Sequence, residues 1–412
     1  MTINALFKRW AIAGGALSGL LIAGLAFSAS PTDANIDYVN PPQGTQAGLG
    51  QPAAKVANTP KSASDAKGIN VSKSAPAAPL SESRKAGNVV SIIGSTLVAA
   101  YAKALSEHLS AQTGLPPAEM HNEGTTRGIK GFCAGVGIEY PDVLASSRKM
   151  RTPEFNDCIE HGAKDLLEIM IGYDAAVLVS RIDDETYDLK LGSIYKAVAA
   201  EYPEGYEFQP NHYATWNQLD PNLPNTEIRL VLPTPNLGGR GFFEDFVLQS
   251  ACRKISGIKA IFSADDRIKQ CVNLRKDGRI VELDTPYDAN VMNYLSKAPR
   301  GTMAFMPMRF AKEHPDVFKL QPINGVMPSA EDVSKHRYQF VRYLYFYVKK
   351  DHMKDYHGKG LVKGLREFVT EVTREETLGP DGYLSKLGLI PMPEERRRIV
   401  RDNSLLLTPM ER

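Results

Sequence analysis

The stretch NVVSIIGSTLVAAYAKALSEHL, Asn88–Leu109, decides the fold class. A short β-branched run leads into Gly94, Ser95 and Thr96, and apolar residues then recur at helical spacing, which predicts a strand, a loop and a helix. Two similar units follow in AEMHNEGTTRGIKGFCAGV (118–136) and PDVLASSRKM (141–150). Strands that alternate with helices in this way predict an α/β fold with mixed, mostly parallel sheets.

Other short apolar runs extend the pattern along the chain. The predicted strands are residues 175–180, 227–233, 259–263, 302–308 and 343–350, and the last predicted helix includes residues 364–373. We interpret the aromatic run YLYFYV in the last of these strands as core.

The composition excludes several classes of function. A formal net charge of +2 is too balanced to suggest nucleic-acid binding. The chain has no Walker loop, GxGxxG, HExxH or CxxC, so we expect no cofactor and no metal site. His352 and His357 lie in a polar turn, where we expect them to be solvated rather than metal ligands. Without a metal or nucleophile constellation, an enzyme is not expected.

The N-terminus indicates export. Lys8 and Arg9 precede the apolar run Trp10–Phe27, and Ala26 and Ser28 are small residues at the positions that a signal peptidase reads. The run is borderline in length between a cleaved signal peptide and a retained membrane anchor, so residues 1–28 are one or the other. In both cases the positive charges stay inside and the rest of the chain is exported.

Residues 29–88 form a predicted linker. They are rich in Ala, Pro, Ser, Lys, Gly and Asn, and Tyr38 is their only aromatic residue, so they cannot bury enough apolar surface to fold. A long spacer is useful if residues 10–27 remain in the membrane, and is otherwise a neutral tail.

The four cysteines fit an exported chain, in which an even number favours disulfides. We predict Cys133–Cys158 and Cys252–Cys271, because each pairing closes a short local loop. The alternative is buried free thiols. Metal binding is less favoured, since neither pair has zinc-ligand spacing.

Four predicted strand-to-helix loops carry hydroxyls, glycines or arginines. In open α/β sheets ligands bind where such loops converge, and arginine is a strong partner for an oxyanion. Taken singly, a Ser-Thr turn is an ordinary helix cap, and an arginine is an ordinary salt-bridge partner. The candidate oxyanion-binding residues are Ser95, Thr96, Thr125, Thr126, Arg127, Ser147, Arg148, Gly238, Gly239 and Arg240.

From about Val89 to Arg398 the chain resembles the phosphate-specific periplasmic binding proteins of ABC importers, especially the alphaproteobacterial type. The resemblance rests on motifs that keep their order and spacing across most of the chain. They are GST (94–96), EGTTRGIKGFC (123–133), DVLASSRKM (142–150), IGYDAAVLVSR (171–181), WNQLDPNLPNTEIRLVLPTPNLGGRGFFEDFV (216–247), RYLYFYVKK (342–350) and GPDGYLSKLGLIPMPEERR (379–397).

This resemblance implies a two-lobed periplasmic binding protein fold of type II, with two mixed sheets flanked by helices and joined by a hinge of two strands. Lobe 1 would comprise residues 89–177 and 311–398, lobe 2 residues 178–310, and residues 399–412 a tail. Phosphate or a related oxyanion would bind between the lobes in the periplasm. Hinge closure would then present it to an inner-membrane ABC permease.

This sequence matches the family's phosphate-binding positions unevenly. Ser95, Thr96, Thr125, Ser147 and Arg148 fall on family positions that donate to phosphate. The third loop lacks the aspartate that the enterobacterial type uses to accept the phosphate proton.

The fourth loop departs most from the family motif Ser-Gly-Thr-Arg. Leu237 and Gly239 stand in the two hydroxyl positions, while Gly238 and Arg240 are kept. Arg127 either replaces the lost donors or points outward, to Glu123 or to an acidic residue of the other lobe. The alternative function is therefore a membrane-tethered relative with a degenerate pocket, acting as a receptor or a structural protein.

Overall fold

The computed structural model describes residues 81–235, 237–353 and 360–411. The predicted signal peptide or anchor, and the predicted linker up to residue 80, lie outside the described residues, as does His357. Within the described ranges, no helix is both long and apolar enough to cross a membrane.

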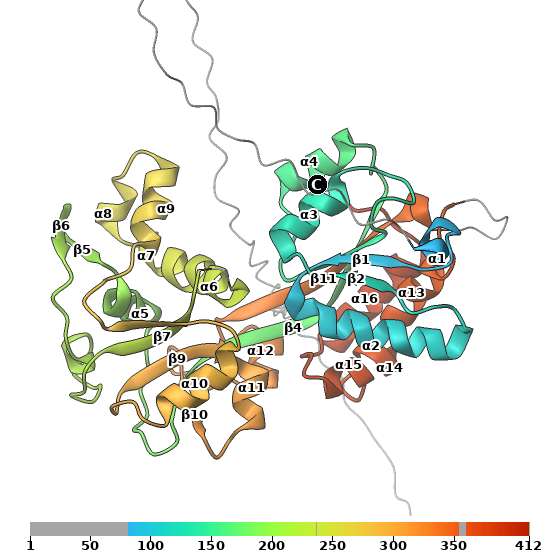
Figure 1. The fold of residues 1–412 in the computed structure, drawn as a ribbon. Helices are drawn as coiled ribbons and strands as arrows, with labels where there is room; N and C mark the ends of the chain where they lie inside the picture. Colours follow the sequence, from blue (N-terminus) through green and yellow to red (C-terminus); the bar gives the residue numbers. More distant parts are fainter. Residues whose placement is uncertain (1–80, 236, 354–359, 412) are drawn as a thin grey trace, which may run out of the picture. The chain divides into compact units, whose positions relative to one another are not determined.

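One mixed sheet organises the described chain, with strand order β2-β1-β3-β11-β4-β9-β7-β8 and β10 paired to β4 (Figure 1). A separate hairpin is formed by β5 and β6. The strands are β1 Ser91–Gly94, β2 Glu119–His121, β3 Val143–Ser146, β4 Leu166–Arg181, β5 Glu201–Glu204, β6 Glu207–Pro210, β7 Arg229–Pro233, β8 Ile280–Leu283, β9 Thr302–Pro307, β10 Phe318–Leu320 and β11 Val341–Lys349.

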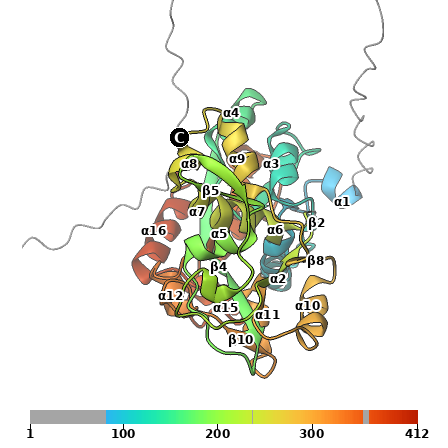
Figure 2. The same cartoon turned by 90° about the vertical axis from the view of Figure 1, so that its left-hand side faces the viewer.

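Helices flank the sheet (Figure 2). Both α2 and α3 pack on β1 and β3, and α13 packs against α2 and α16. The α-helices are α1 Glu82–Lys85, α2 Thr96–Thr113, α3 Thr125–Cys133, α4 Thr152–Glu160, α5 Leu191–Val198, α6 Gly238–Phe242, α7 Ser250–Cys252, α8 Ser256–Lys259, α9 Ala264–Val272, α10 Tyr287–Leu295, α11 Met308–Glu313, α12 Ala330–Ser334, α13 Leu365–Val372, α14 Glu375–Leu378, α15 Tyr383–Lys386 and α16 Glu394–Leu405. A π-helix, η2 (Phe243–Gln249), joins α6 to α7, and the 3-10 turns are η1 Trp216–Gln218 and η3 Lys350–His352.

The α/β class agrees with the prediction, and the strand directions show how the sheet is assembled. β1 is parallel to β2 and β3, and β7 is parallel to β8 and β9. Between these groups run β4 and β11, which pair in antiparallel fashion, so the sheet is mixed rather than mostly parallel. The predicted core strand at residues 343–350 is β11, which is almost entirely buried.

The long strand β4 changes partner in its middle. Its residues up to Ala175 pair with β11, and from Ala176 they pair with β9. β10 pairs with the end of β4, from Val179 to Arg181, so the chain still runs beside β4 after β9 and before β11.

The folded part begins before Asn88, which corrects the predicted end of the linker. Arg84 of α1 is buried and reaches Asp142 at 2.5 Å. Composition could not reveal this order, because it depends on a partner far along the chain.

The prediction that His352 is solvated is wrong, because the residue is fully buried. Its Nδ1 lies 2.7 Å from Asp142 Oδ1, and its Nε2 accepts the Gly137 backbone N–H at 3.0 Å. An Nε2 that accepts must be unprotonated, so the ring is neutral and donates from Nδ1.

The structure also bears on the predictions for the segment 259–263, the C-terminal tail and the disulfides. The segment 259–263 is not a strand; it contains the end of α8 and irregular chain. The predicted C-terminal tail is largely ordered, because α16 runs to Leu405 and the Met410 N–H donates to Leu166 O. Both predicted disulfides, Cys133–Cys158 and Cys252–Cys271, are present.

Candidate functional site

The first three predicted loops meet at one edge of the sheet. β1, β2 and β3 are parallel neighbours, so their carboxyl ends lie together. The Ser95 N–H donates to Ala145 O at 2.8 Å, and the Gly124 N–H donates to Gly94 O at 2.8 Å. These backbone bonds tie the end of each strand to its neighbour.

Two glycines make this close approach feasible. A Cβ on Gly94 would lie 2.0 Å from Ala145 O, and Gly94 has a φ of +137° that other residues rarely adopt. A Cβ on Gly128 of α3 would lie 2.5 Å from Gly94 Cα. Gly94 therefore allows β1 to approach Ala145 of β3, and Gly128 allows α3 to pack directly on the end of β1.

Hydroxyl groups join the second and third loops. Thr125 Oγ1 and Ser147 Oγ are 3.0 Å apart, and the Ser147 N–H donates to Thr125 Oγ1 at 3.2 Å. Ser146, which our site prediction leaves out, is buried and donates from Oγ to Arg148 O at 2.5 Å. Its position at the end of a strand in a Ser-Ser-Arg run is the signal that could have found it.

The helices that start here leave their first N–H groups free of side-chain caps. Ser95 is the N-cap of α2 and Gly124 that of α3, and neither makes a side-chain cap bond. The first turns of both helices hold no acidic residue. Because a helix N-terminus carries partial positive charge, this edge is suited to an anion.

Arg127 adopts the outward arrangement. Its side chain is 79% exposed, and its Nε donates to Glu123 O at 3.1 Å and lies 3.8 Å from the Glu123 carboxylate. Thr96 and Thr126 are also exposed, each in the first turn of its helix.

Arg148 is held by a carboxylate in the first turn of α4, the helix that follows its loop. Its two Nη atoms donate to Glu154 at 2.8 and 2.6 Å in a fork. Burial would raise the pKa of Glu154, but the hydrogen bonds and charge of Arg148 outweigh it and lower that pKa below its usual value. Glu154 therefore remains an anion that offsets the Arg148 charge.

The fourth loop follows β7 and opens α6, where Leu237 is the N-cap and Gly238 and Gly239 are the first helical residues. Arg240 is buried between two carboxylates, with Nε 2.7 Å from Glu244 and Nη1 2.5 Å from Glu282. Its charge is thus already compensated by Glu244 of η2 and Glu282 of β8.

Positive charges at the third loop act on a carboxyl group that follows the fourth loop. Asp245 lies on η2, a π-helical segment of a kind often found at functional sites. Desolvation raises the pKa of Asp245, while the positive charges of Arg151 and Arg148 act in the opposite direction.

A polar pair that sequence reasoning missed lies where β4 changes partner. Asp174 and Arg342 are direct register partners on β4 and β11, and Arg342 Nη2 is 2.9 Å from Asp174 Oδ2. Phe242 of α6 lies under the Arg342 guanidinium, with the ring centroid 4.5 Å away. Tyr101 of α2 interacts with the charges of both partners.

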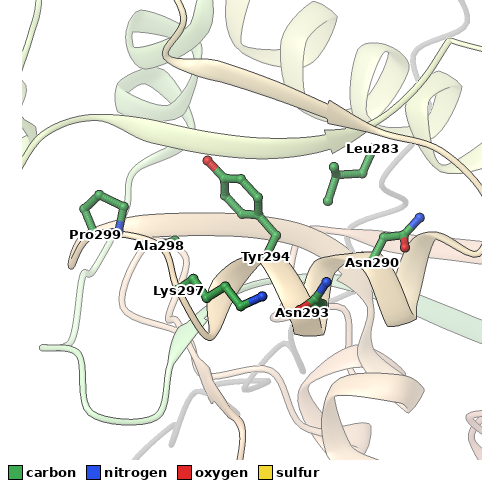
Figure 3. Close-up of a pocket in the computed structure, with 7 residues that line it drawn as sticks. All are labelled: Leu283, Asn290, Asn293, Tyr294, Lys297, Ala298 and Pro299. Carbon is green, nitrogen blue, oxygen red and sulfur yellow. The ribbon is translucent and has the colours of Figure 1, made fainter.

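A separate hollow opens between α10 and β8 (Figure 3). It contains none of the predicted site residues, and we do not assign it to an oxyanion. Its lining is Leu283, Asn290, Asn293, Tyr294, Lys297, Ala298 and Pro299. In the described part of the chain, no cluster of three or more His, Cys, Asp or Glu side chains could hold a metal ion.

Comparisons with known proteins agree with this architecture. Protein SphX from Synechocystis is 24% identical over 312 residues, which are 74% of this chain and 79% of SphX. The structure of an ABC-type phosphate transport receptor from Vibrio cholerae aligns with a TM-score of 0.51 and 16% identity, covering 74% of this chain and 100% of that one. A phosphate binding protein from Stenotrophomonas maltophilia aligns with a TM-score of 0.52 and 15% identity, covering 76% and 93%.

These solved structures share the fold of this chain, an α/β arrangement with a mixed sheet and flanking helices. The PBP superfamily domain matches residues 59–376, which is most of the sequence. The chain is a member of the PBP superfamily.

Proposed function

We propose that this protein is an exported solute-binding protein that captures phosphate or a related tetrahedral oxyanion for an ABC importer. The observation that carries the proposal is the meeting of the α2 and α3 N-termini with the Thr125–Ser147 hydroxyl pair at one sheet edge. Relatives described as a phosphate transport receptor and a phosphate binding protein support the choice of oxyanion.

Capture would use donors from two lobes. Lobe 1 would offer Ser95, Thr96, Thr125, Thr126 and Ser147, and lobe 2 the backbone of Gly238 and Gly239 at the start of α6. The return crossing would lie at the start of β11. Closure about β4 and β11 would bring these groups together in the periplasm and present the loaded form to the permease.

Calorimetry of the full chain with inorganic phosphate, arsenate and sulfate tests this proposal. Neutral donors fixed at helix ends should give measurable heat with phosphate at submillimolar concentration. The absence of heat with every oxyanion at millimolar concentration would reject it.

The second candidate is a membrane-tethered relative with a degenerate pocket. It is favoured by the carboxylates that already neutralise Arg148 and Arg240. Mass spectrometry of the native N-terminus addresses the tether, because a mature chain beginning at Ala29 rules out a retained anchor.

A further inference from the structure

Between Leu237 and Phe243 the start of α6 carries no Ser or Thr hydroxyl, and the structure offers other donors elsewhere. Arg127, the replacement that the sequence suggests, turns away to Glu123. Arg148 is paired with Glu154 of α4, and Arg240 with Glu244 of η2 and Glu282 of β8. The three arginines of the predicted loops are therefore all paired with acids.

Arg342 has hydrogen-bonding capacity that the protein does not use. Its side chain is 9% exposed, and its only close polar neighbour among the described residues is Asp174 at 2.9 Å. Its Nε is buried without a partner. A guanidinium has five N–H donors, so most of those of Arg342 remain for a ligand.

Tyr101 is a second donor of the same kind. It is 3% exposed, and its hydroxyl makes no hydrogen bond to any part of the protein that the structure describes. Burial raises its pKa, so the hydroxyl keeps its proton and can donate. Helical side chains lean toward the helix N-terminus, which directs Tyr101 toward the Ser95–Thr96 end of α2.

Each side chain is connected with a helix that begins at a predicted loop. Tyr101 is in the second turn of α2, which begins at the first loop. Arg342 stacks on Phe242 of α6, which begins at the fourth loop. The charges of Arg342 and Asp174 both act on the Tyr101 hydroxyl.

We propose that the Tyr101 hydroxyl and the Arg342 guanidinium form an oxyanion subsite beside the point where β4 changes partner, which supplies the hydroxyl donors missing from the start of α6. The subsite rests on the proposed function and deepens it. Asp174 holds the guanidinium in place and limits its net charge, so the subsite suits one oxygen edge of a tetrahedral anion rather than a larger polyanion.

Calorimetry of the full chain with inorganic phosphate tests the subsite. Tyr101→Phe removes one oxygen and should raise the Kd for phosphate about tenfold, because a hydrogen bond to a charged group is lost. Arg342→Lys keeps the charge but loses the planar fork and should raise the Kd by about tenfold or more. Tyr206→Phe and Arg337→Lys, both at exposed positions, serve as matched controls and should bind as the wild type does.

Each outcome has a distinct meaning. If wild type binds phosphate and Tyr101→Phe binds equally well, the subsite is wrong while the proposed function stands. If wild type gives no heat with phosphate or sulfate, the proposed function fails and the subsite fails with it. If Arg342→Lys does not fold, as judged by thermal unfolding, Tyr101→Phe alone decides.

Discussion

At the scale of single residues, Asp142 shows how a buried charge is made tolerable. It is fully buried, and it accepts hydrogen bonds from Arg84, from the Ser91 backbone N–H at 2.8 Å and from His352 at 2.7 Å. A buried carboxylate is stable only when such partners replace water. Because Arg84 comes from α1, this network fixes the point where the chain enters the folded domain.

Removal of Arg84 should therefore be costly. Arg84→Met leaves Asp142 without its main cation, and we expect the free energy of unfolding to fall by about 3–5 kcal/mol. Lys85→Met on the same helix removes only an exposed pair with Glu82 and should cost less than about 1 kcal/mol. Urea unfolding of both variants checks this contrast, and equal losses would contradict it.

Lys349 should make stability depend on pH. Its pKa is lowered from 10.5 to about 7, mainly by burial. The charge of Asp142 raises this pKa, and the charge of Arg84 lowers it. Between these two values the unfolded chain binds more protons than the folded one, so the free energy of unfolding should rise with pH across this window. Below about pH 7 both states are protonated and this contribution is constant.

Lys349→Met should remove this rise in the free energy of unfolding, which is on the order of a few kcal/mol. Chemical denaturation of wild type and variant at pH 7, 8.5 and 10 measures the difference, with the exposed Lys363→Met as control. A constant difference between wild type and Lys349→Met at all three pH values would show that Lys349 does not titrate in this range.

The site residues differ in how far the sequence could predict them. Thr125 and Ser147 stand at the ends of recognisable strands, so parallel pairing alone brings them together. Tyr101 and Arg342 are ordinary core positions by pattern. The position of Arg342 opposite Asp174 depends on the pairing of β4 with β11, and no local signal reports that pairing.

At the scale of elements, the contact of α3 with β1 is set by glycines. Gly128 packs on Gly94, and the same approach lets the Gly124 N–H reach Gly94 O at 2.8 Å. The absence of a side chain at Gly128, one turn into α3, therefore determines the position of the α3 N-terminus. It also determines the position of the Thr125 hydroxyl there.

Gly128→Ala should disturb both stability and the site. The new methyl group would meet backbone, which cannot move aside as a flexible side chain can, so we expect a loss of about 1–3 kcal/mol and weaker phosphate binding. Gly241→Ala in α6 adds a methyl group in open space and should be neutral or stabilise by up to about 1 kcal/mol. Thermal unfolding and calorimetry compare the two, and an unchanged Gly128→Ala protein would contradict the packing argument.

Among the elements, long periodic segments were predictable and short ones were not. The α2 helix and the β11 strand have clear patterns and are found where expected. The run at 259–263 has the composition of a strand, but it contains the end of α8 and the irregular chain before α9. β10 has only three residues, and its place is set by pairing with the distant end of β4.

At the scale of the whole molecule, the two groups of parallel strands are joined through β4. The strand is continuous from Leu166 to Arg181, yet its partners change between Ala175 and Ala176. A bend at this point would move one group of parallel strands relative to the other without breaking the strand pairs within either group. The Asp174–Arg342 pair stands directly beside it.

Phosphate should therefore change the separation of the two groups. Spin labels placed by bioorthogonal chemistry at Lys130 of α3 and Lys254 after α7, both exposed, avoid the two native disulfides. We expect their distance distribution to shift to shorter values with saturating phosphate, since an anion held from both sides favours the closed form. Labels at Lys130 and Lys363, which both lie on the β1 side of the change, are the control and should not move. Heat of binding without a shift in the first pair would show that the anion binds to one group of strands alone.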